Sequence, residues 1–371
     1  MNDVPTYWDY LKLDQLLTLQ GGLENDETDH LPDELHFIIV HQTYELWFKL
    51  VLRSLRSARD ELAQPLVDEQ TVPVVAHHLR RINSILRLGV HQMEVMETLA
   101  PQDFLAFRDK LVPSSGFQSF QMREIEILMG LEDAKRIRYG GIDPLQHIRE
   151  VAHDTPAGRM ARKRIDDARA ERTMLGVLND WLYRTPIMGS IPSDAGDAEV
   201  VAAFVDDYAV RLAALYDRNH DRLVETLGGK DSDGMRARFD TLVAAARAFL
   251  DATDIAEPHR AKIRRVRAAA VFIESYRNLP LLAWPRLLLD LVVEMEEQLV
   301  LWRHRHARMV ERLIGRRVGT GGSGGVAYLD STGSYRVFRD LWAVRTLLLP
   351  KDGLPHLPDP AFYKFMAPPA P

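Results

Sequence analysis

The sequence predicts an all-α fold in which long helices pack as a bundle. Apolar residues recur at three- and four-residue spacing along most of the 371 residues, which is the period of a helix with one buried face. Alternating patterns typical of β-strands are scarce. Hydrophobic residues make up 46% of the chain, which is enough for a large core. Length alone would suggest two domains, but we expect a single domain over 1–371 that carries a helical insertion.

The expected helices are separated by breaks of recognisable chemistry. Pro32 and Asp33 precede the first long helix, a Pro-Ser-Ser-Gly run interrupts the chain at 113–116, and a Gly-Gly pair at 228–229 separates two Ala- and Arg-rich stretches. Helical periodicity covers 34–63, 70–99, 118–131, 160–184, 197–227, 233–252, 258–281 and 283–315. We interpret 195–260 as a helical insertion on the bundle rather than a separate catalytic domain.

The glycine-rich segment GTGGSGG at 319–325 is expected to be the most flexible part of the chain. Glycine reaches positive φ and allows close backbone approach. The segment lacks the Lys-Ser/Thr pair that completes a phosphate-binding P-loop. We therefore predict that residues 316–333 form a mobile loop over a pocket. The proline-rich tail at 353–371 is expected either to strap over the surface or to fray.

Composition excludes several classes of protein. A net charge of −6 and a pI near 6.1 give no electrostatic case for nucleic acid or for an anionic membrane as partner. The longest apolar runs, such as 37–40 and 287–293, are far shorter than a bilayer span. The first residues lack the basic start and apolar core of a signal peptide. We expect a cytoplasmic protein.

The chain has no cysteine, which limits the metal chemistry it can support. Disulfides, Fe–S clusters, thiolate-ligated haem and thiolate zinc sites are excluded. Any metal ion must be held by His, Asp, Glu or Tyr. The motifs GxxxxGK[ST] and HExxH do not occur, and no GxGxxG follows a strand. Common nucleotide-binding and zinc-protease functions are therefore not indicated.

Two histidines lie in the middle of apolar helical faces. His41 shares its face with Phe37 and Phe48, and His306 shares its face with Trp302 and Met309. Residues two positions apart lie about 200° apart around a helix, so His304 faces away from the side that His306 faces. A buried imidazole needs a partner for each ring nitrogen. Each ring could be a core histidine bonded to a carbonyl or carboxylate, or the two could share a buried ligand; spacing alone does not show that they meet.

Arg108 adjoins an apolar helical face formed by residues such as Phe104 and Leu111. Arginine suits bidentate capture of a carboxylate, but a salt bridge with Asp103 or Asp109 would explain it equally. The SSGFQS run at 114–119 could supply hydroxyl and backbone donors to a ligand, or it could simply break the helix.

Taken together, these segments resemble the tryptophan 2,3-dioxygenase family. The resemblance rests on YWDYLKLDQLL (7–17), FIIVHQTYELWFKL (37–50), FRDKLVPSSGFQSFQMRE (107–124), LWRHRHARMVERLIG (301–315) and GTGGSGGVAYL (319–329), in the family's order. The HQxxELWxK and PSSGFQS strings are highly specific. The resemblance implies an all-α homotetramer, a dimer of dimers, with haem b buried between helices. Its ferrous form would oxidise L-tryptophan with O₂ to N-formyl-L-kynurenine.

The resemblance also implies a role for individual residues. His306 would be the axial ligand of the haem iron, His41 the catalytic histidine facing the indole N–H, and Arg108 the partner of the substrate carboxylate. Thr320 would contact the substrate ammonium and carboxylate. Trp302 and Tyr328 would contact the haem, and the other substrate-binding residues would be Phe37, Phe104, Leu111, Ser115 and Gly319. Tyr7, Tyr10 and Leu11, within the segment 1–32, match residues that reach a neighbouring subunit's site.

Two departures from the family's pattern put substrate range and loop dynamics in doubt. Trp8 replaces a glycine between the N-terminal tyrosines, and Gly324 replaces a serine of the glycine loop. The nearest alternative function is a related haem enzyme that oxidises a tryptophan derivative in a biosynthetic pathway. An alternative from another class is a haem-binding sensor or a helical scaffold without turnover.

Overall fold

The computed structural model describes residues 4–138, 143–228, 231–322 and 324–364. These residues fold into helices joined by turns, and the described part of the chain contains no β-strand, only an isolated bridge between Ile187 and Ser190. The predicted all-α fold is confirmed. None of the described helices combines the length and apolar character needed to cross a bilayer. The chain divides into a first unit (Met1–Arg56, Arg80–Arg172 and Met295–Arg336) and a second unit (Ser57–Leu79, Thr173–Glu294 and Val337–Pro371).

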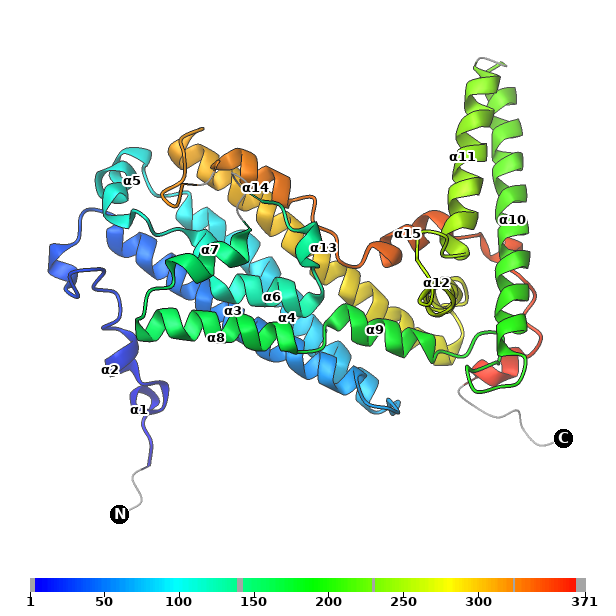
Figure 1. Cartoon of the computed structure of the whole chain (residues 1–371), viewed down its shortest axis with the longest axis horizontal. Coiled ribbons are helices and arrows are strands. Elements are labelled where there is room, and N and C mark those ends of the chain that lie inside the picture. The colour runs from blue at the N-terminus through cyan, green and yellow to red at the C-terminus, as the bar shows by residue number, and fades with distance from the viewer. Residues whose placement is uncertain (1–3, 139–142, 229–230, 323, 365–371) are drawn as a thin grey trace. The chain divides into compact units, whose positions relative to one another are not determined.

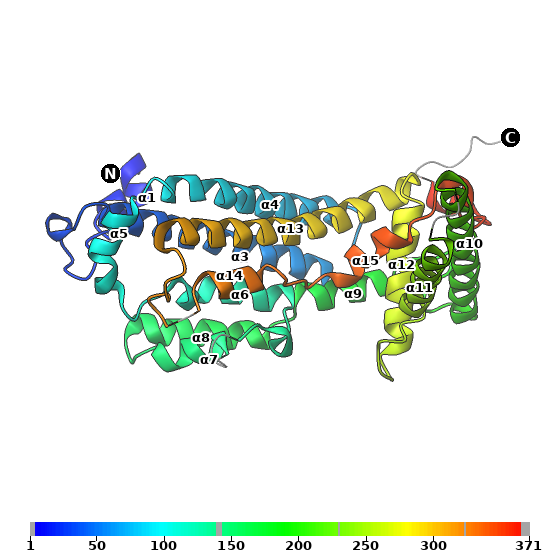
Figure 2. The same cartoon turned by 90° about the horizontal axis from the view of Figure 1, so that it is seen from above.

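Three long helices contribute to the first unit: α3 (Glu34–Leu62), α4 (Thr71–Met96) and α13 (Pro280–Ile314). Figure 2 shows them running side by side. Within this unit they meet at Gly89, where an added Cβ would lie 3.4 Å from the Tyr44 ring and 3.6 Å from the Trp302 ring. The Tyr44 hydroxyl donates a hydrogen bond to the Gly89 carbonyl at 2.6 Å. A small residue at this point therefore lets two aromatic rings pack directly against the α4 backbone.

The shorter helices of the first unit surround this core. They are α1 (Tyr7–Leu11), α2 (Leu13–Leu16), η1 (Glu27–Asp29), α5 (Pro101–Phe107), η2 (Arg108–Leu111), η3 (Gly116–Gln118), α6 (Phe120–Met129), η4 (Asp133–Lys135), α7 (Pro144–Val151), α8 (Pro156–Ala170) and α14 (Val326–Thr332). α6 packs against α8 and is buried from Gln121 to Met129. Its carboxylate Glu124 is paired with Arg56 at 2.5 Å and Arg164 at 2.6 Å. In contrast, α1 and α2 bury none of their residues.

The second unit is built around α12 (Arg260–Ser275), in which residues 265–274 are all buried. The other helices of this unit are α9 (Met174–Tyr183), α10 (Asp197–Thr226), α11 (Ser232–Leu250), α15 (Arg339–Leu347), η5 (Lys351–Gly353) and η6 (Pro360–Tyr363). α10 and α11 form an antiparallel hairpin that packs on α12 (Figure 1). This hairpin occupies the segment 195–260. Its predicted status as an insertion in a single domain stays a prediction.

The tail packs against the second unit as far as it is described. Tyr363 is buried; its hydroxyl donates to the Pro186 carbonyl at 3.1 Å and accepts from the Gly189 N–H at 2.9 Å. Of the two expected arrangements, the strap over the surface is therefore observed to 364, and residues 365–371 lie outside the described residues.

Several helix boundaries differ from the expected ones; the helix expected at 258–281, for instance, spans Arg260–Ser275. The single helix expected at 160–184 is two helices, because Glu171 is extended and Thr173 caps α9 by accepting from the Gly176 N–H at 3.0 Å. The last long helix begins at Pro280 rather than 283, since proline is favourable at the first helical position. The helices α1, α2, α7, α14 and α15 were not predicted, because they are too short to show a period, whereas α5 carries part of the apolar helical face expected beside Arg108.

Candidate active site

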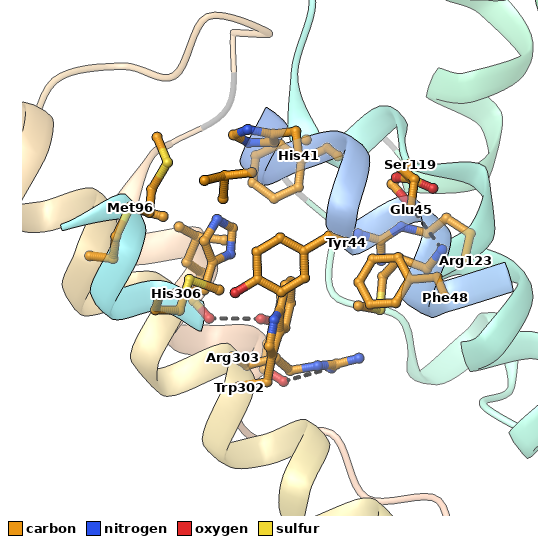
Figure 3. Close-up of a pocket in the computed structure, with 18 of the residues that line it drawn as sticks. His41, Tyr44, Glu45, Phe48, Met96, Ser119, Arg123, Trp302, Arg303 and His306 are labelled. Carbon is orange, nitrogen blue, oxygen red and sulfur yellow. Dashed lines mark hydrogen bonds between the residues drawn. The ribbon is translucent and has the colours of Figure 1, made fainter. Parts of the chain in front are cut away.

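Two adjoining cavities lie in the first unit, and the two apolar-face histidines line both of them. His41 of α3 and His306 of α13 share this role with Met96, Phe117 and Met309. Figure 3 shows both imidazoles projecting into one cavity. The space free of protein atoms in these two cavities, open solvent included, is about 850 Å³ and 750 Å³. The structure therefore brings the two histidines to the same cavities, which their spacing in the sequence could not show.

The His41 ring is fixed in one tautomer by its own helix. Its Nδ1 lies 2.8 Å from the Phe37 carbonyl oxygen. A carbonyl can only accept a hydrogen bond, so Nδ1 carries the hydrogen and Nε2 of the neutral ring keeps a lone pair. Burial lowers the pKa of His41, although the Phe37 carbonyl and the Glu45 carboxylate oppose the shift. His41 therefore offers an acceptor from a neutral ring.

The His306 ring is half-buried against the cavity wall and stacks on Trp302, with ring centroids 5.0 Å apart. Burial lowers its pKa to about 4, and the neighbouring His41 adds to this shift. Within the described part of the chain, neither ring nitrogen makes a hydrogen bond. A core histidine would need such partners. The same helix carries His304 exposed on the opposite face, which confirms the predicted orientation of both residues.

The wall around His306 is apolar and aromatic. Tyr44 and Phe48 stand edge-on to Trp302, each with ring centroids 6.1 Å away. Thioether side chains of Met93, Met96, Met122 and Met309 complete much of the surface. No group of three or more His, Asp or Glu side chains suited to a metal ion occurs among the described residues. A neutral imidazole in an apolar and aromatic wall is the kind of ligand that the iron of a porphyrin takes.

The second cavity extends from His41 to Arg108 and the glycine-rich loop. Phe37 and Phe104 line it, with ring centroids 5.8 Å apart. Arg108 Nη2 donates to the Val318 carbonyl, and its Nε is buried without a hydrogen-bond partner among the described residues. In this part of the chain Arg108 forms no ion pair, so the alternative of a salt bridge with Asp103 or Asp109 is not observed.

The glycine-rich loop packs closely on the 113–116 turn. The Thr320 hydroxyl donates to the Ser114 carbonyl at 2.6 Å. An added Cβ at Gly321 would lie 2.7 Å from the Ser115 Cβ, closer than side chains approach one another. Ser115, Gly319 and Thr320 all line the second cavity. Of the predicted loop 316–333, residues 326–332 form the helix α14, and Ser323 lies outside the described residues.

A buried ionic cluster forms another part of the first cavity wall. Glu126 of α6 contacts three guanidinium groups: Arg123 at 2.9 Å, Arg136 at 2.6 Å and Arg303 at 2.7 Å. Burial raises the pKa of Glu126, but the three arginines outweigh it and hold that pKa at about 2. Sequence reasoning missed this cluster. The three-residue spacing from Arg303 to His306 was the one available signal.

Several expected site residues lie elsewhere. Leu111 and Tyr328 line neither cavity, although Tyr328 is buried against the Phe117 ring at 4.9 Å. Tyr7, Tyr10 and Leu11 are 71%, 79% and 43% exposed and line neither cavity of their own chain.

Comparison with known proteins gives one consistent family. The family model described as Tryptophan 2,3-dioxygenase matches residues 2–348. The chain is 46% identical to a tryptophan 2,3-dioxygenase of Sorangium cellulosum, over 97% of this chain and 87% of that protein. It is 44% identical to the protein named tryptophan 2,3-dioxygenase 2 of Ralstonia nicotianae, over 97% of both. A tryptophan 2,3-dioxygenase of Dictyostelium discoideum is 33% identical over 95% of this chain and 86% of that protein.

Proposed function

The chain belongs to the tryptophan 2,3-dioxygenase family, and from this premise we propose that the paired cavities of the first unit are its active site. The enzyme oxidises L-tryptophan with O₂, cleaving the indole 2,3 bond to give N-formyl-L-kynurenine, the first step of tryptophan catabolism. The names of its relatives favour this reaction over oxidation of a tryptophan derivative in a biosynthetic pathway. One observation carries the assignment of the site: two neutral imidazoles from α3 and α13 line one apolar space.

His306 is the proposed axial ligand of haem b. The support is a neutral imidazole without a hydrogen-bond partner among the described residues, beside aromatic side chains that could pack on a flat macrocycle. Trp302 would hold the ring of His306 in position by stacking on it. When bound, ferrous haem supplies the redox chemistry that activates O₂. The protein supplies position, polarity and exclusion of water.

Arg108 and Thr320 are the proposed partners of the tryptophan carboxylate and ammonium. A zwitterion in a largely apolar pocket needs a partner for each charge. Arg108 has an unpaired buried Nε and a guanidinium geometry suited to a carboxylate. Phe37 and Phe104 would form walls for the indole, with Ser115 and Gly319 at the loop side. We do not extend this role to Leu111, which lines neither cavity.

His41 is the proposed acceptor of the indole N–H. Its Nδ1–H is occupied by the Phe37 carbonyl, so only Nε2 can accept. Because burial lowers the pKa of the ring, it stays neutral at physiological pH and keeps that lone pair. Anchoring the indole N–H at one end and the carboxylate at the other would orient the 2,3 bond for reaction.

We also propose that the enzyme is a homotetramer in which the segment 1–32 packs on another copy. In support, α1 and α2 bury no residue and expose Tyr7, Tyr10 and Leu11. Large exposed apolar side chains in one segment indicate an interaction surface. The segment 316–333, which ends in α14, is the proposed cover of the substrate cavity. A cytoplasmic location stays a prediction from the sequence.

A single-turnover experiment tests the proposed function. The haem-loaded, reduced protein is mixed without oxygen with L-tryptophan and then exposed to ¹⁸O₂. We expect the absorbance of N-formyl-L-kynurenine to appear, and mass spectrometry should show two labelled oxygen atoms in the product. Incorporation of one labelled atom, or no consumption of tryptophan by fully haem-loaded protein, would contradict the proposal.

A further inference from the structure

The cluster around Glu126 contains more positive than negative charge. Arg123, Arg136 and Arg303 contact its single carboxylate, and Asp133 offsets only one more of these charges by pairing with Arg136 at 3.1 Å. Three cations against two anions leave at least one positive charge uncompensated. The side chains of Arg123, Arg136 and Arg303 are 7%, 0% and 8% exposed. Charge out of water is costly unless it is paired.

The excess charge adjoins the cavity at Arg123. This residue lines the first cavity together with Glu126 and Arg303, whereas Arg136 does not line it. Arg123 uses Nη1 for both oxygens of Glu126, at 3.0 and 2.9 Å. Its Nε is buried and has no hydrogen-bond partner in the described part of the chain. A guanidinium with an unused donor therefore borders the space that His306 faces (Figure 3).

No group among the described residues accepts a hydrogen bond from Arg123 Nε. The neighbouring Arg303 uses both of its terminal nitrogens, donating to the Thr332 carbonyl at 3.0 Å and to Glu126 at 2.7 Å. The other carboxylate of the cavity wall, Glu45, accepts from the Gln121 side-chain amide at 2.7 Å. Among the described residues Glu45 forms no ion pair with Arg123. The missing partner of Arg123 must then come from what fills the cavity.

The chemistry of the wall defines that partner. Most of the lining is aromatic and aliphatic, and a guanidinium whose Nε has no hydrogen-bond partner among the described residues borders it. Such a lining matches a flat apolar molecule that carries a carboxylate at its edge. Haem b has this form, since its macrocycle is apolar and two propionates project from one edge. We propose that Arg123, supported by Arg303, is the carboxylate anchor of this cavity and holds a propionate of the haem.

This inference rests on the proposed haem site, and binding measurements without substrate can test the two separately. Haemin and haemin dimethyl ester are titrated into the apoprotein, and the affinity is read from the Soret band. The ester keeps the macrocycle and the iron but has no carboxylate charge. We expect wild-type protein to prefer haemin by roughly 10- to 100-fold, the range for a hydrogen bond to a charged group.

Arg123→Met should lose this preference by weakening haemin binding by the same factor, roughly 10- to 100-fold, while leaving ester binding nearly unchanged. Arg123→Lys should recover part of the preference for haemin, because lysine restores the positive charge but not the paired N–H donors of a guanidinium. Arg136→Met is the matched control: it removes a guanidinium from the same carboxylate without lining the cavity. It should destabilise the fold yet keep the preference for haemin.

The possible outcomes separate the two proposals. Equal affinity of wild-type protein for haemin and its ester would overturn the anchor and leave the haem site intact. An undiminished preference for haemin in a folded Arg123→Met variant would overturn it as well. If wild-type protein binds neither porphyrin, the proposed haem site itself fails. Because the wild-type comparison needs no variant, an unstable Arg123→Met protein would not remove the test.

Discussion

Each unit contains a buried arginine cluster, and the two clusters differ in how completely they are satisfied. In the second unit, Arg265 pairs with Asp197 at 2.7 Å, and its remaining donors reach the carbonyls of Tyr183, Thr185 and Ser190. Arg267 of the same helix contacts two carboxylates and the Phe249 carbonyl. In the first unit, three arginines share Glu126, and among the described residues Arg123 Nε beside the cavity and Arg136 Nη2 away from it are both buried without a hydrogen-bond partner.

The difference separates structural from functional buried charge. In a cluster that only supports the fold, the hydrogen-bonding capacity is filled by the protein itself, since an unsatisfied buried group costs free energy. A cluster that is left open beside a cavity indicates a ligand that completes it. On this view, mutations in the closed cluster should change stability alone, and those in the cavity walls should change binding.

The largest expected effect is on haem retention. His306→Ala should lose most bound haem, because it removes the proposed axial ligand, whereas His41→Ala should keep haem and slow turnover. Haem content per protein after desalting is the measurement. His304→Ala is a matched control, since this histidine lies exposed on the opposite face of the same helix. Equal haem content in wild type and His306→Ala would exclude the assigned ligand.

The closed cluster should respond through stability. Arg265→Met leaves Asp197 buried without its partner, and breaking such a pair costs roughly 3–5 kcal/mol of unfolding free energy. Urea denaturation measures this loss. Haemin affinity of the folded variant should equal that of wild type. A large loss of haemin affinity would show that the two clusters do not differ in the way described.

The open cluster should also give a pH-dependent contribution to stability. The pKa of Glu126 is about 2 in the folded protein against 4.5 ordinarily, so the ionised carboxylate stabilises the fold. This contribution is fully present above about pH 4.5 and is lost as the pH falls towards 2. Glu126→Gln should therefore cost roughly 3 kcal/mol near pH 7. Urea denaturation at pH 7, 5 and 3 should show the gap between wild type and variant narrowing only below pH 5; a constant gap would contradict it.

The smallest effect concerns substrate affinity in the second cavity. Arg108→Ala should raise KM for L-tryptophan roughly 10- to 100-fold through loss of a charged hydrogen bond, with a smaller change in kcat. The KM of Arg108→Lys should lie between those of wild type and Arg108→Ala, because lysine keeps the positive charge but cannot bind a carboxylate through two parallel hydrogen bonds. Steady-state kinetics at saturating O₂ measure both constants. A fall in kcat with unchanged KM would argue against a role in substrate binding.

Periodicity predicted the all-α fold and the orientation of His41, His304 and His306, because a helix with one buried face leaves a clear pattern. It could not predict Arg123, since α6 is buried along nearly its whole length and shows no contrast between faces. Arg303 belongs to the sequence Arg-His-Arg directly before His306, so only its three-residue spacing from His306 distinguished it from its polar neighbours. The roles of Tyr328 and Leu111 came from resemblance alone, and neither residue lines a cavity. The proposed role of Tyr7 and Tyr10 involves a second copy of the chain, which a single chain does not contain.

The hydrogen bond between His41 Nδ1 and the Phe37 carbonyl determines how the His41 ring is oriented. Donor and acceptor are one helical turn apart on α3, so the ring's orientation depends on local backbone geometry rather than on distant parts of the chain. The acceptor, His41 Nε2, is therefore oriented before the substrate binds, and no binding energy is needed to align it. Substitutions remote from this turn can change the size of the pocket. In such variants His41 should still carry its hydrogen on Nδ1 and its lone pair on Nε2.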